Sequence, residues 1–159
     1  MVTVTTEFTR PANTTAYTAG DVVSDSASAT TVQTLVGAAR ASGKPGYIVG
    51  LKLETDKKSI VPRMRVHLYN ASSITVAVDN LPWRDSYADA SKRIGFWDFS
   101  PLTTGADATN SDMSWAVDLA CRIPFVSVDA NLYFVLEAID GSNTNSGQKF
   151  RLTATVEQY

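Results

Sequence analysis

Three carboxylates interleaved with aromatic residues form the part of the chain best suited to chemistry. The carboxylates are Asp85, Asp89 and Asp98, and the aromatic residues are Trp83, Tyr87, Phe96 and Trp97. Two carboxyl groups held about 5–9.5 Å apart can hydrolyse a glycosidic bond, and aromatic rings stack on sugars. The segment therefore supports either a hydrolase that uses one of the aspartates or a glycan-binding site formed by Trp83, Tyr87 and Trp97. Alternatively, the aromatic residues cap one end of the fold or fill a subunit interface, where Trp and Tyr are enriched.

The chain contains a single histidine, His67, and a single cysteine, Cys121. Zinc sites usually take four ligands, mostly His and Cys, so the sequence predicts no metal site and no cofactor. No motif marks a nucleophile that His67 could activate as the base of a catalytic triad. We expect His67 to lie on an exposed or interface-forming strand face together with Arg63 and Arg65. These three residues are therefore candidate interface contacts.

Apolar and polar residues alternate with period two through the last third of the chain, in residues 115–123, 132–138 and 149–157. Successive side chains of a strand leave opposite faces, so each run predicts a half-buried strand. The expected buried face of the first run consists of Trp115, Val117, Leu119, Cys121 and Ile123. That of the last run consists of Phe150, Leu152, Ala154 and Val156. Cys121, which has no disulfide partner, is thereby predicted to be a core residue.

Further strands are predicted upstream at residues 31–36, 47–54, 60–69, 73–78 and 94–99. In the second of these, Tyr47, Val49, Leu51 and Leu53 are expected to share the buried face. Residues 56–59 form a predicted turn, and the Gly-, Ser- and Asn-rich residues 140–147 a predicted hairpin loop between the last two strands. Residues 1–9 alternate weakly and are expected to form an edge strand or an extended N-terminal arm.

Eight or nine short strands with turn signals between them, and no long helix, predict an all-β fold. An antiparallel β-sandwich of the jelly-roll type fits this count best. No linker or repeat divides the 159 residues, so we expect residues 1–159 to form a single domain.

Composition narrows the classes of partner. The formal net charge is −2, whereas nucleic-acid-binding domains are usually strongly basic, so we expect no direct contact with nucleic acid. Charged residues make up only 19% of the chain, below the roughly 25% of ordinary soluble domains. The amino terminus lacks the features of a secretory signal, and no apolar run reaches the length of a membrane-spanning helix. We therefore expect no export and no membrane contact.

Two stretches of the sequence carry a resemblance to a known class of protein. They are FTRPANTTAYTAGDVV at residues 8–23, and NLYFVL at 131–136 followed by SGQKF at 146–150. Together they resemble small structural proteins of tailed bacteriophages. This resemblance implies a jelly-roll capsid decoration or cement protein that is made in the host cytoplasm and then joins the capsid surface. Such proteins bind the lattice of the major capsid protein as dimers or trimers and stabilise the head.

Three functional hypotheses follow, in this order. The first is a non-enzymatic virion protein that decorates the capsid. The second is a tail or head appendage that binds a host-surface carbohydrate. The third is a small jelly-roll hydrolase.

Overall fold

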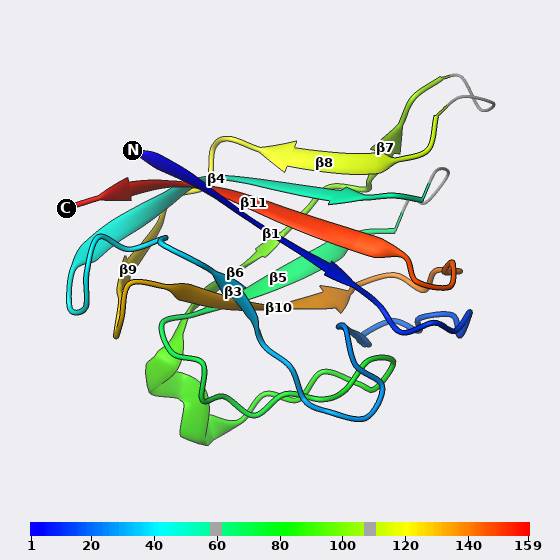
Figure 1. The fold of residues 1–159 in the computed structure, drawn as a ribbon, viewed down its shortest axis with the longest axis horizontal. Coiled ribbons are helices and arrows are strands. Elements are labelled where there is room, and N and C mark those ends of the chain that lie inside the picture. The colour runs from blue at the N-terminus through cyan, green and yellow to red at the C-terminus, as the bar shows by residue number, and fades with distance from the viewer. Residues whose placement is uncertain (58–61, 107–110) are drawn as a thin grey trace.

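Two antiparallel sheets face each other in the computed structural model, which describes residues 1–57, 62–106 and 111–159 (Figure 1). The six-stranded sheet contains, in spatial order, β1 (Val2–Thr9), β11 (Lys149–Gln158), β4 (Pro45–Thr55), β8 (Ser114–Asp118) and β7 (Thr103–Thr104), and β9 (Ile123–Val126) also pairs with β4. The five-stranded sheet contains β2 (Val22–Val23), β10 (Leu132–Ala138), β5 (Met64–Tyr69) and β6 (Arg93–Asp98), and β3 (Gln33–Leu35) also pairs with β10. A short 3-10 helix, η1 (Tyr87–Lys92), precedes β6.

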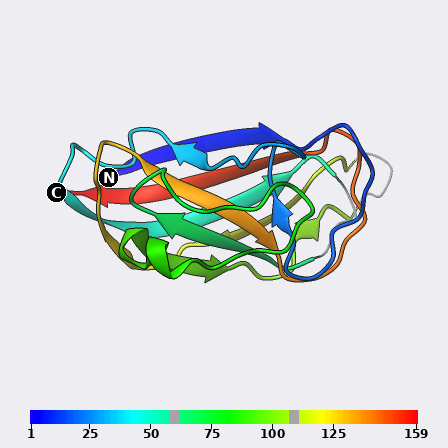
Figure 2. The ribbon, with the colours of Figure 1, turned by 90° about the horizontal axis from the view of Figure 1, so that it is seen from below.

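The strand order is that of a jelly roll. Apart from β3, β7 and β9, the strands in chain order are β1, β2, β4, β5, β6, β8, β10 and β11. The first, eighth, third and sixth of these form one sheet, and the second, seventh, fourth and fifth form the other. This is the two-sheet, double Greek-key arrangement of jelly rolls, so the predicted antiparallel sandwich is confirmed. Both chain ends lie at one end of the sandwich, and the loops that follow β1 and β10 lie at the other (Figures 1 and 2).

The core lies between the sheets, and the predicted pattern of β11 is confirmed. Phe150, Leu152, Ala154 and Val156 are all fully buried. From the facing sheet, Met64, Val66 and Leu68 of β5 join the same cluster. Beyond β11, β1 pairs with that strand along all eight of its residues and so forms one edge of the six-stranded sheet.

The predicted buried face of β4 is only half right because the strand contains a β-bulge. Leu51 and Leu53 are buried as expected, but Ile48 is buried in place of Tyr47 and Val49. The pairing with β11 jumps from Gly50 opposite Thr155 to Ile48 opposite Val156, which leaves Val49 without a partner. An extra residue in one strand reverses the alternation of faces beyond it.

The predicted strand 115–123 is wrong in both extent and orientation. It divides into β8 and β9, and Trp115, Val117 and Leu119 point outward rather than into the core. Cross-strand partners project to the same face of a sheet, and β8 pairs so that Ala116 lies opposite the buried Leu53. This register places small residues inside and large ones outside. The predicted burial of Cys121 and Ile123 is confirmed, because the chain turns back toward the core after β8.

Residues 73–78 form no strand, contrary to the prediction. Instead, the segment 70–92 crosses the outer surface of the five-stranded sheet (Figure 1). Val76 and Ala77 are buried there in a second apolar cluster with residues of the sheet, namely Val22, Tyr69, Tyr133 and Val135. The apolar residues of this segment therefore pack as a layer over the sheet and do not form a strand of it.

The predicted hairpin between the last two strands is also wrong, because β10 and β11 belong to different sheets. Residues 139–148 cross from one sheet to the other at the end of the sandwich. The predicted strand 60–69 corresponds to β5, which begins at Met64. Ile60 and Val61 of that strand, and Lys58 and Ser59 of the predicted turn, lie outside the described residues.

Candidate functional site

His67 is buried rather than exposed, because the segment 70–92 covers this face of β5. Its exposed fraction is 4%, and the Trp83 ring stacks on the imidazole with 4.3 Å between ring centres. The imidazole Nε2 lies 2.6 Å from Oε2 of Glu137, whereas Nδ1 has no hydrogen-bond partner among the described residues. Burial lowers the pKa of His67, and Glu137 opposes that effect. A neutral imidazole that donates from Nε2 to Glu137 fits these contacts.

Arg63 and Arg65 remain at the margin of this covered face, and each pairs with a carboxylate. The Arg63 Nη2 donates to Oδ1 of Asp140 at 2.8 Å, and this guanidinium lowers the pKa of Asp140 to about 2. The Arg65 Nη2 donates to Oδ2 of Asp98 at 2.8 Å. The Arg65 guanidinium also lies over the ring of Phe96, 4.6 Å from its centre.

The structure does not bring the three candidate glycan-binding aromatic residues together. Trp83 lies flat on His67, and Tyr87 of η1 is 96% exposed. Trp97 points to the opposite face of β6, because its cross-strand partner Val66 is buried. There the indole packs against the main core. Of these three residues, only Tyr87 therefore presents a free aromatic ring to solvent.

The three carboxylates of the hydrolase hypothesis are each paired with a different cation. Asp85 accepts a hydrogen bond from Nη1 of Arg93 at 2.7 Å, and Asp98 is paired with Arg65. Asp89 accepts from the backbone N–H of Thr75 at 2.7 Å and from Nζ of Lys92 at 2.9 Å. These contacts lower the pKa of Asp89 and of Asp98. A glycosidase general acid requires the reverse, a carboxyl group whose pKa is raised.

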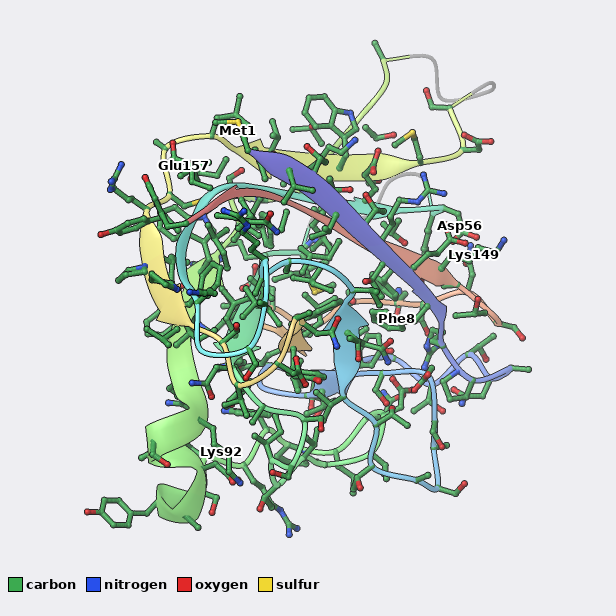
Figure 3. The ribbon with its side chains drawn as sticks, turned by 60° about the vertical axis from the view of Figure 1, so that its left-hand side comes forward. Met1, Phe8, Asp56, Lys92, Lys149 and Glu157 are labelled. Atoms are coloured by element: carbon green, nitrogen blue, oxygen red, sulfur yellow. The ribbon has the colours of Figure 1, made fainter. Side chains whose placement is uncertain are left out.

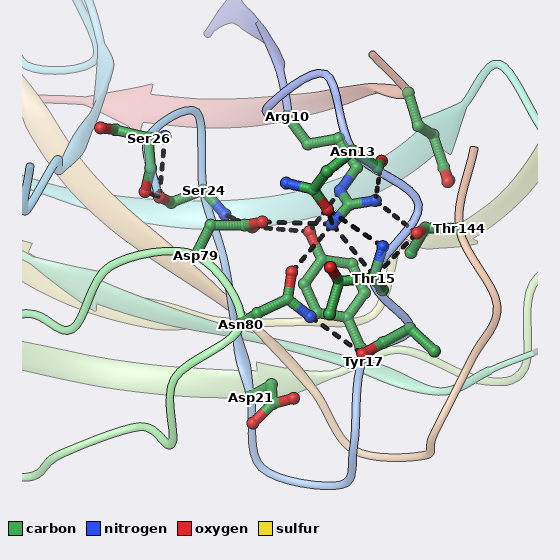
Figure 4. A network of polar contacts seen from close by, with 12 residues as sticks. Arg10, Asn13, Thr15, Tyr17, Asp21, Ser24, Ser26, Asp79, Asn80 and Thr144 are labelled. Carbon is green, nitrogen blue, oxygen red and sulfur yellow. Dashed lines mark hydrogen bonds and ion pairs between the residues drawn. The ribbon is translucent and has the colours of Figure 1, made fainter. Parts of the chain in front are cut away.

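Sequence reasoning missed a buried polar network centred on Arg10 (Figure 4). Arg10 is 1% exposed, and its Nη2 lies 3.2 Å from Oδ2 of Asp79. Asp79 also accepts from the Tyr17 hydroxyl at 2.7 Å, and burial together with this bond raises the pKa of Tyr17. The guanidinium Nε donates to the Tyr17 hydroxyl at 3.1 Å. Nη1 and Nη2 also reach acceptors of residues 13, 15, 80, 144 and 145. A buried ion pair is tolerated only when its other donors and acceptors are satisfied in this way.

The network joins the two stretches that carry the resemblance to phage proteins. The Arg10 backbone N–H donates to the carbonyl of Gln148 at 2.9 Å, and Tyr17 forms a two-way backbone bridge with Ser142. Gln148 in turn donates from Nε2 to the hydroxyl of Thr55 at 2.6 Å. Arg10 and Tyr17 of the first stretch and Gln148 of the second thus fasten the loops at one end of the sandwich, which is a structural role. Asp79 lies 69 positions from Arg10, and no local pattern connects them.

Exposed apolar side chains gather along β8, on the outer face of the six-stranded sheet. Met113, Trp115, Val117 and Leu119 are 38%, 41%, 42% and 76% exposed, and their spacing of two places them in one stripe. Met1 lines the same hollow as Leu119 and lies beside the end of β8 (Figure 3). Contiguous exposed apolar patches on soluble proteins mark interaction surfaces. The period-two pattern of residues 115–119 was the sequence signal for this stripe, but these side chains were predicted to face the core.

Within residues 1–57, 62–106 and 111–159, no group of three His, Cys, Asp or Glu side chains is placed to hold a metal ion. In the same ranges, no helix has the length and apolar character needed to cross a membrane.

Comparison with known proteins identifies no family. No family model matches the chain, and no curated protein matches it in sequence. Among solved structures, a copper-binding surface protein of Methylomicrobium album BG8, CorA, is 8% identical with a TM-score of 0.38, over 96% of this chain and 93% of its own. A chain from the acid-stable capsid of Helicobacter pylori bacteriophage KHP30 is 12% identical with a TM-score of 0.30, over 100% and 95%. A chain from turnip yellow mosaic virus is 11% identical with a TM-score of 0.31, over 98% and 79%. These weak similarities include viral capsids and assign no function to this chain.

Proposed function

We propose that this protein is a non-enzymatic structural protein of a bacteriophage particle that decorates the capsid by binding the lattice of the major capsid protein. The observation that carries the proposal is the exposed apolar stripe on β8, because such a stripe on a jelly roll calls for a protein partner. The resemblance of residues 8–23, 131–136 and 146–150 to phage structural proteins suggests that this partner is a phage capsid protein. Repeated weak contacts on one lattice then give high avidity without any single strong site.

The state of the carboxylates supports a role without catalysis. Asp85, Asp89 and Asp98 are each neutralised by a cation, which leaves no carboxyl group of this cluster free to act as a general acid. The buried Arg10 network ties the loop that follows β1 to the loop that follows β10 at one end of the sandwich. A rigid body with satisfied polar groups suits a protein that must hold its shape on a capsid.

Copy number per particle tests the proposal. Quantitative mass spectrometry of purified particles of the phage that encodes this chain is expected to give a simple ratio to the major capsid protein, because a decoration protein follows the lattice symmetry. Absence from the particles would rule out the proposal. A few copies per particle would move the protein to the tail or to a single vertex and contradict lattice decoration.

A second candidate function is recognition of a host-surface carbohydrate, and one feature of η1 favours it. Tyr87 is 96% exposed, and it lines a shallow hollow together with Asp85, Ser86, Ala90 and Arg93. An open aromatic ring beside paired polar side chains is a suitable platform for a sugar. In a glycan-array experiment, Tyr87→Ala is expected to abolish a signal that Tyr159→Ala, at another exposed tyrosine, leaves intact. No signal from the unmodified protein on any glycan would eliminate this candidate.

A further inference from the structure

The outer face of the six-stranded sheet is a regular grid of outward side chains from β1, β11, β4 and β8. Because cross-strand partners project to the same side, the register divides the grid into rows. One row contains Glu7, Arg151, Glu54 and Trp115. The next row contains Thr5, Thr153, Lys52 and Val117. Each row thus begins with polar residues on β1 and ends with an apolar residue on β8.

The charges on this grid alternate in sign. Arg151 donates to Glu7 at 3.0 Å, and Lys52 lies 3.2 Å from Glu54 across the two rows. The Lys52 side chain is 41% exposed and that of Arg151 is 50% exposed. The two acidic and two basic residues of these rows balance, so the face carries no excess charge that would repel an identical face.

We propose that a second copy of this chain covers this face, with the two sheets packed face to face around a two-fold axis. This proposal deepens the proposed function by naming the partner of the β8 stripe. The axis lies in the contact plane, perpendicular to β4 and midway between the two rows. It therefore places each row of one copy on the other row of its partner, which is the self-complementary geometry of an isologous dimer.

This arrangement satisfies both the apolar and the charged residues. Trp115 of one copy meets Val117 of the other, and Glu54 meets Lys52, each contact occurring twice. In the same overlay Arg151 and Glu7 meet the uncharged Thr153 and Thr5, so no like charges oppose each other. An apolar cluster with a polar surround is the usual composition of a protein interface.

The face is large enough for such a contact. The four strands β1, β11, β4 and β8 have 8, 10, 11 and 5 residues. At ~3.4 Å per residue and about 4.8 Å between strands they span roughly 550 Å² before the relief of the side chains is counted. A standard interface buries about 800 Å² of accessible surface on each partner. The protruding Met113 and Leu119 side chains extend the contact along β8 at either end of the two rows.

Sedimentation of the full chain tests the contact. The unmodified protein is expected to form a dimer, and Val117→Lys to weaken dimerisation at least about tenfold by placing a charge in the apolar contact. Val36→Lys is the matched control, because Val36 is 71% exposed and lies outside the face. Equal melting temperatures of the unmodified protein and both variants, measured at a concentration below that at which the unmodified protein dimerises, would show that the fold is intact. A monomer or a trimer for the unmodified protein, or a dimer insensitive to Val117→Lys, would refute the contact.

A charge-reversal experiment tests the register. Lys52→Glu places two pairs of like negative charges across the axis, and Glu54→Lys places two pairs of like positive charges there. Each variant alone is expected to dimerise at least about tenfold more weakly. Mixing the two is expected to restore association, because every contact across the axis is then between opposite charges. Failure of the mixture to associate would refute the register, since intramolecular loss of the Lys52–Glu54 pair cannot produce rescue by mixing.

The outcomes separate this inference from the proposed function. A monomeric protein that is nevertheless present in particles at lattice stoichiometry would refute the dimer and retain the decoration role. A protein that dimerises with the predicted charge dependence but is absent from particles would support the dimer and refute the decoration role.

Discussion

Strands β11 and β8 both alternate large apolar residues with other residues. The large apolar residues face the core in β11, whereas they face solvent in β8. In β11 the large apolar residues, such as Leu152, are fully buried. In β8 the large apolar residues, such as Trp115, point to solvent, and Ala116 faces the core. Periodicity therefore identifies a strand, whereas the register with its neighbours decides which face is buried. In β8 the inward residues are small and the large ones face outward, and the proposed dimer contact rests on this observation.

The largest effect that tests this comparison comes from placing the same charge in both strands. Leu152→Asp is expected to cost about 4 kcal/mol or more, because it buries an unpaired carboxylate, and so to prevent folding. In the monomer, at low protein concentration, Trp115→Asp is expected to cost about 1 kcal/mol or less, because the side chain faces solvent there. Urea denaturation followed by circular dichroism measures both. Equal destabilisation by the two changes would mean that the assigned faces of β8 are wrong.

A smaller effect tests whether the loss in the free energy of unfolding depends on the burial of the replaced residue rather than on its type. Arg10→Met is expected to destabilise the protein by about 3–5 kcal/mol, because it leaves the buried Asp79 carboxylate without its cation. Arg151→Met, on the outward face of β11, is expected to leave the free energy of unfolding close to that of the unmodified protein. Thermal and urea unfolding compare the two variants. An Arg10→Met protein as stable as Arg151→Met would contradict the structural role of the network.

The smallest effect concerns the outer face of the other sheet, which the segment 70–92 covers. Burial lowers the pKa of His67 below its ordinary value of 6.5, so the unfolded chain binds a proton more readily than the folded protein does. Stability is therefore expected to fall as the pH decreases through 6.5 toward the lower folded pKa. The charged groups nearest the imidazole are Glu137 of β10, Arg65 of β5, and Arg93 and Asp98 of β6.

Urea unfolding between about pH 7.5 and pH 5, above the range of ordinary carboxylates, measures this dependence. His67→Gln, which does not titrate, is expected to flatten the curve. Stability that rises toward pH 5 would mean that Glu137, rather than burial, controls the histidine.

Much of the fold was predictable from local patterns. The alternation in residues 132–138 and 149–157 predicted β10 and β11, and turn residues between strands predicted a jelly roll. The errors have identifiable physical causes. A one-residue bulge at Val49 reversed the faces of β4, and residues 73–78 formed a covering layer because an outer sheet surface needed apolar contacts. Neither effect leaves a local signature in composition or spacing.

The candidate site was harder to predict because it depends on contacts between distant residues. Asp85, Asp89 and Asp98 are close in sequence, but each is paired with its own cation. Arg10 and Asp79 are far apart in sequence and meet in the interior. Trp83 and Trp97 are both aromatic residues of one segment, but they lie on opposite sides of the five-stranded sheet. Only the tertiary structure distinguishes these cases.

Oxidative footprinting of the unmodified protein, with mass spectrometry to locate the modified residues, tests the central claim most directly. The claim is that the outward face of β8 is a binding surface and is covered when the protein assembles. The account predicts that Trp115 and Leu119 lose reactivity as the protein concentration rises, while the exposed Tyr87 keeps its reactivity. Reactivity of Trp115 and Leu119 that does not change with concentration would contradict it.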